Sequence, residues 1–534
     1  MPTSEDTYDV IVVGSGAGAL VGAYAAASRG LRTLVVEKTP LFGGTTAYSG
    51  GGAWFPGSAP LQRAGIGDNT EDARTYLRDI VADDARIPLQ DAYLSAGAQL
   101  IEELERNAAF GAFTYGPVPD YFHGRPGATA AGSTVFPAEI TVEEMGELAA
   151  LVRTQIPSER FGIDPGPALI GGRALVGRAL KAFMATGNGS YLLETALENL
   201  IVEDGKVVGI EAIRDGEQIA LRARRGVLLA AGGFERNAEM RAEHGSVPLT
   251  GEWSNGAPLN TGDAITAGVA AGAGTDLLDE AWFVPGLMQP DGKPIFQTGI
   301  RGGIWVNGAG ERFLNESMPY DRAGHEMARL FNADGVAHVP AYWVFDQRVI
   351  DRDSFGGDPE LPVPEAWYTS GALRKADTIE ELAELIGVPA DGLRASIEEF
   401  NTYGEKGIDE KFQRGETPWD QMFHHVVGFP AGPALNFIKT IETDLPNPLL
   451  IPIDQPPYYC ATVVLSDIGT KGGLTTDAQA RVLRPDGSLI QGLYAAGNTM
   501  AAMSGRVYPG AGTPIGSSLA FSYLAALDMA GEGA

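Results

Sequence analysis

Glycines and one acidic residue near the start of the chain have the types and the spacing for binding a nucleotide. The stretch YDVIVVGSGAGALVGAYAAASRGLRTLVVEKT contains Gly14-x-Gly16-x-x-Ala19, and Glu37 follows 23 residues after Gly14. Glycines let the backbone approach a pyrophosphate, and an acidic residue at this distance accepts a hydrogen bond from a ribose hydroxyl. Ala19, at the third glycine position, still permits close helix packing. The pattern predicts dinucleotide binding and fits NAD as well as FAD, because both contain ADP.

A second loop of glycines and hydroxyl residues follows directly. The stretch EKTPLFGGTTAYSGGGAWFP contains Gly43, Gly44, Thr45, Thr46, Ser49 and the run from Gly50 to Gly52. Such a loop allows close approach of a longer cofactor along its ribityl chain and ring. A plain surface turn is the alternative, but the length of the loop and its place right after the acidic residue favour FAD.

Three tyrosines, whose phenols can donate or accept a proton, lie in loops. Tyr121 lies in PVPDYFHG, Tyr320 in NESMPYDR and Tyr508 in VYPGAG, each beside or close to a proline that makes the loop rigid. The chain has 17 tyrosines, most of which must be structural. Taken singly, each of the three is therefore expected to be a buried core residue.

The elements that must position these residues are strands that end in glycines. We expect a strand over residues 10–13, a helix of small residues, and a strand over residues 33–36. Farther along, RGVLLAAGGFERN reads as a strand ending in Gly232-Gly233, and GLYAAGNTMA as a strand stopping at Gly497-Asn498. A hairpin is expected to turn at Asp204-Gly205, and a helix to carry Asp263 in its first turn. A final helix is expected in SSLAFSYLAALDMAG.

Between about residues 282 and 457 this strand-and-glycine pattern fades. We expect a hairpin in GGIWVNGAGERFLNES and helices in TIEELAELIGV and DGLRASIEEFNTYGEKG. The fold class predicted is α/β, with a Rossmann-like FAD-binding domain of the glutathione reductase type and an inserted α+β catalytic cap domain. The first segment of the FAD-binding domain is expected over residues 1–281, the cap domain over 282–457, and the second segment over 458–534.

Composition excludes several functions. A length of 534 residues exceeds what one hydrophobic core supports, and a net charge of -29 argues against nucleic acid or an anionic membrane surface as a partner. The single cysteine, Cys460, excludes an internal disulfide and the chemistry of disulfide reductases. The histidines lack metal-ligand spacing, so no metal is expected. The acidic N-terminus and the absence of a long apolar run predict a cytoplasmic protein without an integral membrane segment.

The segments FGGTTAYSGG, NESMPYDR, LSDIGTKGGL, GLYAAGNTMA and GRVYPGAGTPIG together resemble the bacterial 3-ketosteroid Δ1-dehydrogenases, within the fumarate reductase-like flavoproteins. The resemblance covers nearly the whole chain. It implies non-covalent FAD and removal of two hydrogens across C1 and C2 of a 3-ketosteroid. It further implies that Tyr508 and the Gly512 N–H bind the C3 oxygen, that Tyr320 takes the C2 proton, and that Tyr121 is hydrogen-bonded to it or relays that proton. A quinone or other electron acceptor is implied as well.

The motifs and the resemblance together predict the residues that contact FAD. They are Gly14, Ser15, Gly16, Ala17, Gly18, Glu37, Lys38, Gly43, Gly44, Thr45, Thr46, Ser49, Gly50, Gly51, Ala231, Gly232, Asp263, Gly497, Asn498, Pro514 and Ile515.

Other interpretations stay open at this point. A 3-ketosteroid Δ4-(5α)-dehydrogenase would use nearly the same parts, and the tyrosine in NESMPYDR favours Δ1. A fumarate reductase-like enzyme should gather arginines around two carboxylates, yet Arg301, Arg322 and Arg506 belong to different motifs. A flavin-binding electron carrier would leave the cap domain and the loop tyrosines unexplained. The stretch over residues 423–450 is either a lid over the steroid side chain or a surface excursion.

Overall fold

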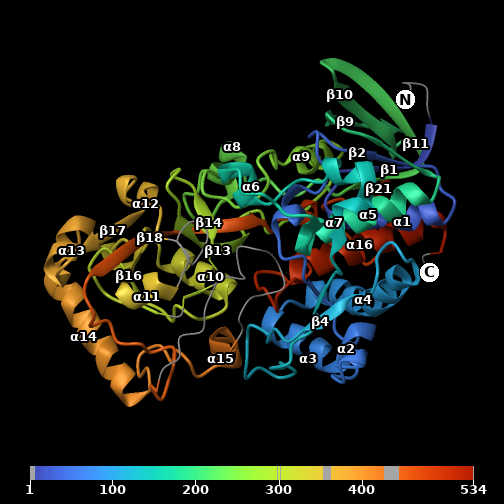
Figure 1. Cartoon of the computed structure of the whole chain (residues 1–534). Helices are drawn as coiled ribbons and strands as arrows, with labels where there is room; N and C mark the ends of the chain where they lie inside the picture. Colours follow the sequence, from blue (N-terminus) through green and yellow to red (C-terminus); the bar gives the residue numbers. More distant parts are fainter. Residues whose placement is uncertain (1–6, 298, 301, 353–361, 426–443, 533–534) are drawn as a thin grey trace. The chain divides into compact units, whose positions relative to one another are not determined.

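The computed structural model describes residues 7–297, 299–300, 302–352, 362–425 and 444–532 (Figure 1). The chain forms two compact units. Unit 1 comprises residues 1–245, 256–281 and 469–534, and unit 2 comprises residues 246–255 and 282–468. Two boundaries differ from the expected ones: residues 246–255 belong to unit 2, and so does the chain from 458 to 468, because strand β18 (Tyr458–Thr470) pairs with β16 (Ala341–Asp346) and β17 (Leu373–Ala376).

Unit 1 is built on a sheet whose centre is parallel and buried. The parallel neighbours run in the order β8 (Gly189–Leu192), β2 (Thr33–Val36), β1 (Thr7–Val13), β11 (Glu217–Leu229) and β21 (Leu489–Ala495). β9 (Thr195–Glu203) and β10 (Lys206–Arg214) form the predicted hairpin at Asp204-Gly205, and β20 (Arg481–Leu483) pairs with β21. Apolar residues that are buried on both faces, such as Ile11 and Val35, are typical of strands covered by helices on both sides.

The register brings four strand ends to one edge. Val13 pairs with Val36 of β2 and with Leu229 of β11, and Leu229 pairs with Ala495 of β21. These strands are parallel, so the residues that follow each of them emerge at the same carboxyl edge, where open α/β sheets bind their ligands. Segments that are far apart in the sequence are thereby gathered into one region.

Helix α1 (Ala17–Ser28) and the final helix α16 (Thr513–Ala530) pack closely in unit 1, and α7 (Gly171–Ala185) also packs on α1. A Cβ added at Gly18 would lie 2.0 Å from the Ser518 Oγ, and one at Gly22 would lie 2.9 Å from the Ser522 Cβ. Both pairs advance in the same direction along the two helices, so their N-termini lie toward the same end. α16 begins at Thr513, four residues before the stretch in which we expected it.

Gly18→Ala is expected to lower the melting temperature and the FAD content of the purified protein. The added methyl group would meet the Ser518 Oγ and, at 2.6 Å, the Ser518 carbonyl oxygen, which forces the two helices apart at an overpacking cost of about 1–3 kcal/mol. Thermal unfolding and the flavin-to-protein absorbance ratio measure both effects. Gly65→Ala, at a turn with φ +80° and no atom within 4 Å, is the control for backbone strain alone. Wild-type values in Gly18→Ala would contradict the close contact.

The other elements of unit 1 surround this core. Their bounds are α2 (Ala59–Arg63), α3 (Thr70–Val81), α4 (Ile87–Arg106), α5 (Val142–Met145), α6 (Ile156–Phe161), α8 (Ala238–His244), α9 (Asp263–Ala270), β3 (Ala53–Trp54), β4 (Thr114–Gly116), β5 (Thr134–Phe136), β6 (Ile140–Thr141), β7 (Ala168–Leu169), β12 (Thr275–Asp276) and β19 (Gly473–Leu474). The predicted helix with Asp263 in its first turn is confirmed as α9.

Unit 2 contains a mostly antiparallel sheet with helices. The strand order is β14 (Pro294–Phe296), β13 (Ala281–Met288), β18, β16 and β15 (Ile304–Val306), and β17 also pairs with β18. The helices are α10 (Tyr320–Leu330), α11 (Gln347–Arg352), α12 (Glu365–Thr369), α13 (Ile379–Ile386), α14 (Ala390–Lys406) and α15 (Pro418–His425). α13 and α14 confirm the two predicted helices, and Thr378 and Glu381 form a capping box at the start of α13.

The hairpin expected over residues 302–317 is present as a tight antiparallel turn, in which the Asn307 N–H donates to the Glu311 carbonyl at 3.0 Å. The chain does turn back after β15, with a single bridge between Val306 and Arg312, but β15 pairs along its length with β16. The guanidinium of Arg312 is bound by buried carboxylates, as described below.

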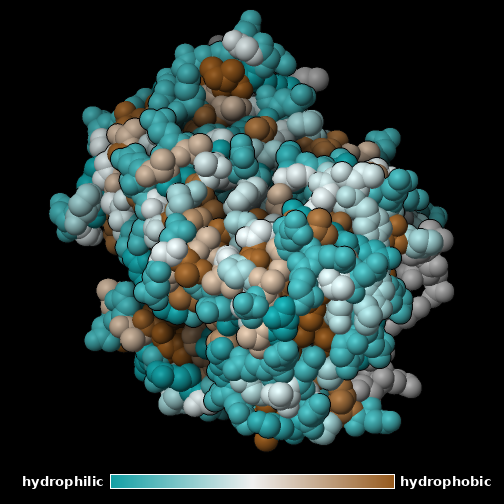
Figure 2. Space-filling view, turned by 90° about the vertical axis from the view of Figure 1, so that its left-hand side faces the viewer, coloured by the Kyte–Doolittle hydropathy of each residue, from teal (hydrophilic) through white to brown (hydrophobic). Residues whose placement is uncertain are grey.

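Figure 2 shows a face that is mainly hydrophilic, with hydrophobic residues in separate groups. Within the described residues, none of the helices has the length and apolarity that crossing a bilayer requires.

Candidate functional site

Glu37 lies at the carboxyl end of β2, next to the glycine turn that follows β1. Its side chain is largely buried, with 9% exposed. One carboxylate oxygen accepts a hydrogen bond from the Ser15 hydroxyl at 2.6 Å, and the other accepts one from the Thr39 N–H at 2.8 Å. Each oxygen retains a lone pair after this, so the carboxylate is held in place and can still accept hydrogen bonds from ribose hydroxyls.

The glycine loop after Glu37 is tied to the start of α1. Gly43 has φ +121° and donates its N–H to the Ser15 hydroxyl at 3.1 Å. The Thr46 hydroxyl accepts a hydrogen bond from the Ala17 N–H at 3.2 Å. At Gly44, where φ is +47°, a Cβ would meet no atom within 4 Å, so open space adjoins the loop there.

The rest of the loop binds neighbouring segments of unit 1. Thr45 accepts hydrogen bonds from the Ala257 N–H at 2.9 Å and from the Asn260 side chain at 3.1 Å. Ser49 donates to the Thr46 carbonyl and accepts from the Gly51 N–H. The loop is thus held by its own hydroxyl groups.

The ends of β11 and β21 are joined by Thr499, which the sequence did not single out. Its hydroxyl accepts a hydrogen bond from the Ala231 N–H at 3.1 Å and donates to the Gly232 carbonyl at 2.8 Å. Gly497 has φ +63°, and Gly232 has φ +82° with Asn260 only 2.8 Å from the position of a Cβ. Neither strand end has room for a larger residue. Asn498 lies in the same short 3-10 helix as Thr499.

Lys38 and Asp263, which were predicted separately, contact each other. The Lys38 ammonium donates to the Asp263 carboxylate at 2.7 Å and to the Thr261 hydroxyl at 2.8 Å. This pair connects the end of β2 to the start of α9.

These groups fit the ADP half of FAD. Glycines stand at the N-cap positions of both α1 and α16. The Ala17 N–H of α1 is bound by the Thr46 hydroxyl, the Thr513 N–H of α16 is bound by the Gly510 carbonyl, and Pro514 has no N–H, so it is the remaining N–H groups of the first turns that can bind an anion. Glu37 provides the acceptor for ribose. Pro514 and Ile515 lie in the first turn of α16 and are half-buried. The donor set therefore matches a pyrophosphate and a ribose in unit 1.

The chain before α16 presents two hydrogen-bond donors at one point. The Gly512 N–H donates a hydrogen bond to the Tyr508 Oη at 3.2 Å, and Tyr508 is 3% exposed. Gly512 has φ +91°, and a Cβ there would lie 2.4 Å from the Gly52 carbonyl oxygen. Only glycine can bring this amide so close to the loop that contains Gly52.

The carbonyl groups of the same segment are bound by side chains behind it. The Lys471 ammonium donates to the Val507 carbonyl at 2.7 Å, the Tyr76 hydroxyl to the Pro509 carbonyl at 2.8 Å, and the Thr134 hydroxyl to the Ala511 carbonyl at 2.8 Å. With its carbonyls fixed in this way, the segment over residues 507–512, here called the donor ribbon, holds its orientation before any ligand binds.

Tyr121 lies against this ribbon. Its ring centroid is 5.1 Å from that of Tyr508 at an angle of 51°, and its N–H donates to the Pro509 carbonyl at 2.9 Å. The structure thus brings together three of the four predicted catalytic residues, Tyr121, Tyr508 and Gly512, in unit 1.

Tyr320, the fourth, is the first residue of α10 in unit 2. Its ring makes edge-to-face contacts with Phe296 and Trp419. The distances between ring centroids are 4.8 Å to Phe296 and 6.1 Å to Trp419. The helix dipole places positive potential at this end of α10.

The loop before Tyr320 is anchored by a buried ionic cluster. Glu316 accepts hydrogen bonds from Arg312 at 2.8 Å and from Arg414 at 3.2 Å, and Arg312 also donates to Asp409 at 2.7 Å. All four side chains are at most 1% exposed. Burial lowers the pKa of Arg414 to about 10, against the effect of Glu316. The cluster fixes the segment that leads into Tyr320.

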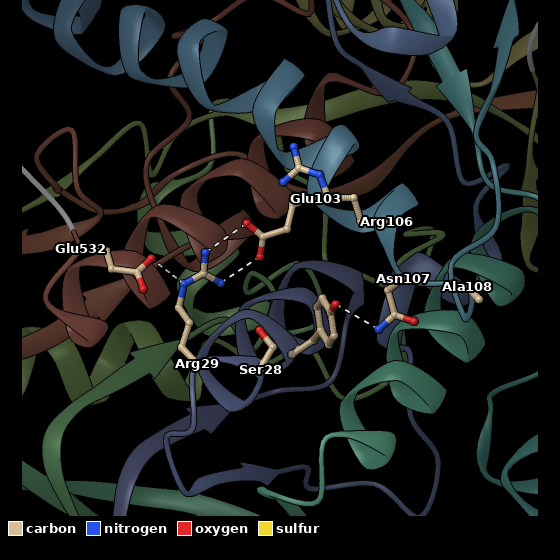
Figure 3. Close-up of a pocket in the computed structure, with 8 residues that line it drawn as sticks. Ser28, Arg29, Glu103, Arg106, Asn107, Ala108 and Glu532 are labelled. Carbon is tan, nitrogen blue, oxygen red and sulfur yellow. Dashed lines mark hydrogen bonds and ion pairs between the residues drawn. The ribbon is translucent and has the colours of Figure 1, made fainter.

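One hollow of about 610 Å³ lies away from these groups (Figure 3). In it Arg29 donates to Glu103 at 2.8 Å and to Glu532 at 2.8 Å, and Asn107 donates to Tyr24. Tyr24 and Ser28, in the C-terminal half of α1, line the hollow, which therefore lies away from the N-terminus of that helix. Its ion-paired lining is unsuited to an apolar ligand. Among the described residues no cluster of three metal-ligating side chains occurs.

The sequence of this chain is similar to a known protein family and to proteins of known name. Residues 9–515 match the family described as FAD binding domain. The 3-oxosteroid 1-dehydrogenase of Mycobacterium tuberculosis is 39% identical over 573 aligned positions, which cover 98% of each chain. The 4-oxocyclohexanecarboxylate 2-dehydrogenase of Sinomonas cyclohexanicum is 33% identical, over 100% of this chain and 94% of that protein.

A solved structure agrees with these sequences. The 3-ketosteroid delta1-dehydrogenase from Sterolibacterium denitrificans, in complex with 1,4-androstadiene-3,17-dione, has a TM-score of 0.86 and 33% identity, covering 98% of this chain and 99% of that one. The predicted fold class is confirmed, and so is FAD as the cofactor. The chain therefore belongs to the family of FAD-binding flavoproteins that contains the 3-oxosteroid 1-dehydrogenases.

Proposed function

We propose that the chain is an FAD-dependent 3-ketosteroid Δ1-dehydrogenase. The observation that carries the proposal is the contact of Tyr508 with Gly512, whose N–H donates to the Tyr508 Oη at 3.2 Å. The amide and the phenol therefore lie at one place, where a ketone oxygen would take over the hydrogen bond of the amide and accept a second one from the phenol. The relative named 3-oxosteroid 1-dehydrogenase, with 39% identity over 98% of both chains, supports the same substrate class.

The reaction removes one hydrogen of the substrate as a proton and another as a hydride. The C2 hydrogen of the substrate is acidified by the carbonyl at C3, whereas the C1 hydrogen is not. As the C2 proton leaves, negative charge develops on the C3 oxygen, and the Tyr508 hydroxyl and the Gly512 N–H stabilise it. Bound FAD supplies the acceptor for the hydride that leaves C1. In this proposal Glu37 and the first turns of α1 and α16 hold the cofactor.

Tyr320 takes the C2 proton in this mechanism, and Tyr121 is hydrogen-bonded to it or relays the proton onward. A tyrosine in water has a pKa near 10, so forming its phenolate at pH 7 costs roughly 4 kcal/mol. The position of Tyr320 at the N-terminus of α10 supports the role, because the positive end of the helix dipole stabilises a phenolate. We expect activity to rise on the alkaline side.

The test is anaerobic mixing of the holoenzyme with 4-androstene-3,17-dione. Bleaching of the visible flavin absorbance, with 1,4-androstadiene-3,17-dione as the product, is expected. An unchanged flavin spectrum at saturating steroid would contradict the proposal and favour an electron carrier. With a ketone whose A ring is saturated, the position of the new double bond separates Δ1 from Δ4 dehydrogenation.

A single-ring ketone is a second candidate substrate. It is favoured by the 33% identity to a relative named 4-oxocyclohexanecarboxylate 2-dehydrogenase over the whole chain. The two candidates share a ring ketone dehydrogenated near its carbonyl and differ in size and charge. Comparing kcat/KM for 4-oxocyclohexanecarboxylate and for the steroid decides between them. A quinone or other carrier is proposed as the electron acceptor, and stopped-flow reoxidation with a soluble quinone tests it.

A fumarate reductase-like activity gains no support from Arg506. Its guanidinium donates to Asp279 at 2.9 Å and to Glu280 at 3.2 Å, so its charge is already paired with acidic side chains of unit 1. The stretch over residues 423–450, considered as a lid, lies mostly outside the described residues.

Glu37→Ala is expected to weaken FAD binding by about 10- to 100-fold. The change removes an ionised acceptor whose hydrogen bonds are each worth about 1.5–3 kcal/mol, and it also releases Ser15 and Thr39. Titration of the apoprotein with FAD, followed by flavin fluorescence, measures the dissociation constant. Glu71→Ala, at a largely exposed position on α3, should leave that constant unchanged. Wild-type affinity in Glu37→Ala would remove Glu37 from the cofactor site.

A further inference from the structure

The segment that carries Tyr121 contains a buried acidic residue that the reaction above does not use. Asp120 is 2% exposed. Its carboxylate is bound by the Trp54 indole and the Thr129 N–H, and within the described residues it forms no ion pair with a lysine, arginine or histidine. Burying a carboxylate without a cation is costly, and a neutral side chain would serve packing better. The position therefore calls for an explanation beyond packing.

Both carboxylate oxygens of Asp120 are occupied by donors from different segments. Oδ1 accepts a hydrogen bond from the Trp54 Nε1 at 2.9 Å, and Oδ2 accepts one from the Thr129 N–H at 2.9 Å. The Asp120 N–H in turn donates to the Thr129 carbonyl at 3.1 Å. Asp120 thus closes the base of the loop over residues 121–128 and joins it to β3, where Trp54 lies.

The Asp120–Trp54 pair packs against the middle of the donor ribbon. A Cβ at Gly510 would lie 2.7 Å from the Trp54 Nε1 and 3.1 Å from the Asp120 Oδ1. Gly510 stands midway between Tyr508 and Gly512. The pair therefore occupies the space next to Gly510 and restricts movement of the ribbon toward that side.

We infer that the ionised carboxylate of Asp120 is a positioning group for ketone binding: by holding Trp54 and the Thr129 N–H it fixes Gly510 and, with it, the donor pair of Tyr508 and Gly512. The inference rests on the proposed function of that pair. Asp120 itself touches neither the substrate nor the cofactor in this scheme.

The protonation state of Asp120 changes this arrangement. A neutral carboxylic acid has one oxygen that donates, and that oxygen would face an N–H donor, so one of the two hydrogen bonds is lost on protonation. Burial raises the pKa of Asp120 to about 7, and the hydrogen bonds from Thr129 and Trp54 act in the opposite direction. Activity should therefore rise with pH as Asp120 ionises. The titratable groups near it are the phenols of Tyr76, Tyr115, Tyr121 and Tyr508, while His123 and Arg125 are exposed.

Stability should respond in the opposite direction. The pKa of Asp120 is raised from 3.8 in the unfolded chain to about 7 in the folded one, so between these values the folded protein holds a proton that the unfolded chain has released. This contribution to stability is present at low pH and is lost as the pH rises through about 7. Asp120→Asn lacks it, so the melting temperature of the wild type should fall relative to that of Asp120→Asn as the pH rises.

The experiment compares the holoenzymes of the wild type, Asp120→Asn and Trp54→Phe in kcat, KM and their pH profiles, and in melting temperature against pH. Asp120→Asn keeps the shape but cannot accept both hydrogen bonds. We expect kcat to be roughly 10-fold lower. The rise of activity with pH near neutrality, here called the acidic limb and assigned to ionisation of Asp120, should be absent. Trp54→Phe removes a hydrogen bond that favours the ionised form, so its acidic limb should move to higher pH. Asp164→Asn, in an exposed turn where it accepts from the Gly166 N–H, is the control and should match the wild type.

The outcomes distinguish an error in the role of Asp120 from an error in the proposed function. An Asp120→Asn protein with the wild-type kcat and the same acidic limb overturns the inference, as does an unshifted acidic limb in Trp54→Phe. Should Asp120→Asn fail to fold, Trp54→Phe alone decides. A wild type that never reduces its flavin with the steroid overturns the proposed function, whereas an active wild type with indistinguishable variants overturns only the role of Asp120.

Discussion

Tyr320→Phe is expected to lower kcat by about 10²–10⁴, the range that general-base catalysis contributes. The phenolic hydroxyl is the only group removed, and the ring can keep its edge-to-face contacts with Phe296 and Trp419. KM and the flavin spectrum should change little, because binding of the ketone and of FAD does not depend on this hydroxyl in the proposed mechanism. Steady-state kinetics with a soluble acceptor measure the effect.

Hydrogen exchange separates the base from the rest of the reaction. If Tyr320 removes the C2 proton, the wild type should catalyse deuterium exchange at C2 in heavy water under anaerobic conditions, and Tyr320→Phe should not. Tyr368→Phe changes a half-exposed tyrosine of α12 and serves as the matched control. Full turnover in Tyr320→Phe would end its assignment as the base and require another acceptor for the proton.

Tyr508→Phe is expected to lower kcat by about 10²–10³, the effect of removing one donor from an oxyanion site. The Gly512 N–H would remain as the single donor to the C3 oxygen. The ring should stay in place, since Tyr508 is 3% exposed and packs against Tyr121. Rapid anaerobic mixing reports the rate of flavin reduction directly, apart from reoxidation.

The matched control for Tyr508 is Tyr494→Phe. Tyr494 is also a buried tyrosine of unit 1, and its hydroxyl donates to Asp528 at 2.7 Å rather than to the donor ribbon. Its loss should affect stability more than the reduction rate. Equal reduction rates in Tyr508→Phe and the wild type would show that the ketone is bound elsewhere.

The meeting of strand ends at the edge of unit 1 that we propose as the cofactor site could be predicted because its determinants are local. Gly14 and Glu37 follow two strands at a fixed spacing, and Gly232 and Gly497 each end an apolar run. Parallel strands then place all such ends at one edge, so a rule of topology turns local patterns into a shared site. Helices α13 and α14 were predictable for a similar reason, since caps and apolar periodicity lie within each segment.

Groups that act across long sequence distances could not be predicted. Thr499 joins two strand ends, and Asp120 reaches Trp54, only because the fold brings these residues together. The start of α16 was placed too late because Gly512 and Pro514 read as loop residues, although glycine at an N-cap and proline in the first turn suit a helix start. The turn after β15 could be predicted from its glycines, whereas the pairing of β15 with β16 could not, because β16 lies farther along the chain.

The contact between α1 and α16 joins segments that are about 500 positions apart in the sequence, since Gly18 meets Ser518. At the roughly typical synthesis rate of 5–20 residues per second, about 25–100 s pass between the synthesis of the two partners. During that interval α1 lacks the helix that covers its glycine-lined face in the folded protein. This contact is therefore expected to form late in the folding of unit 1.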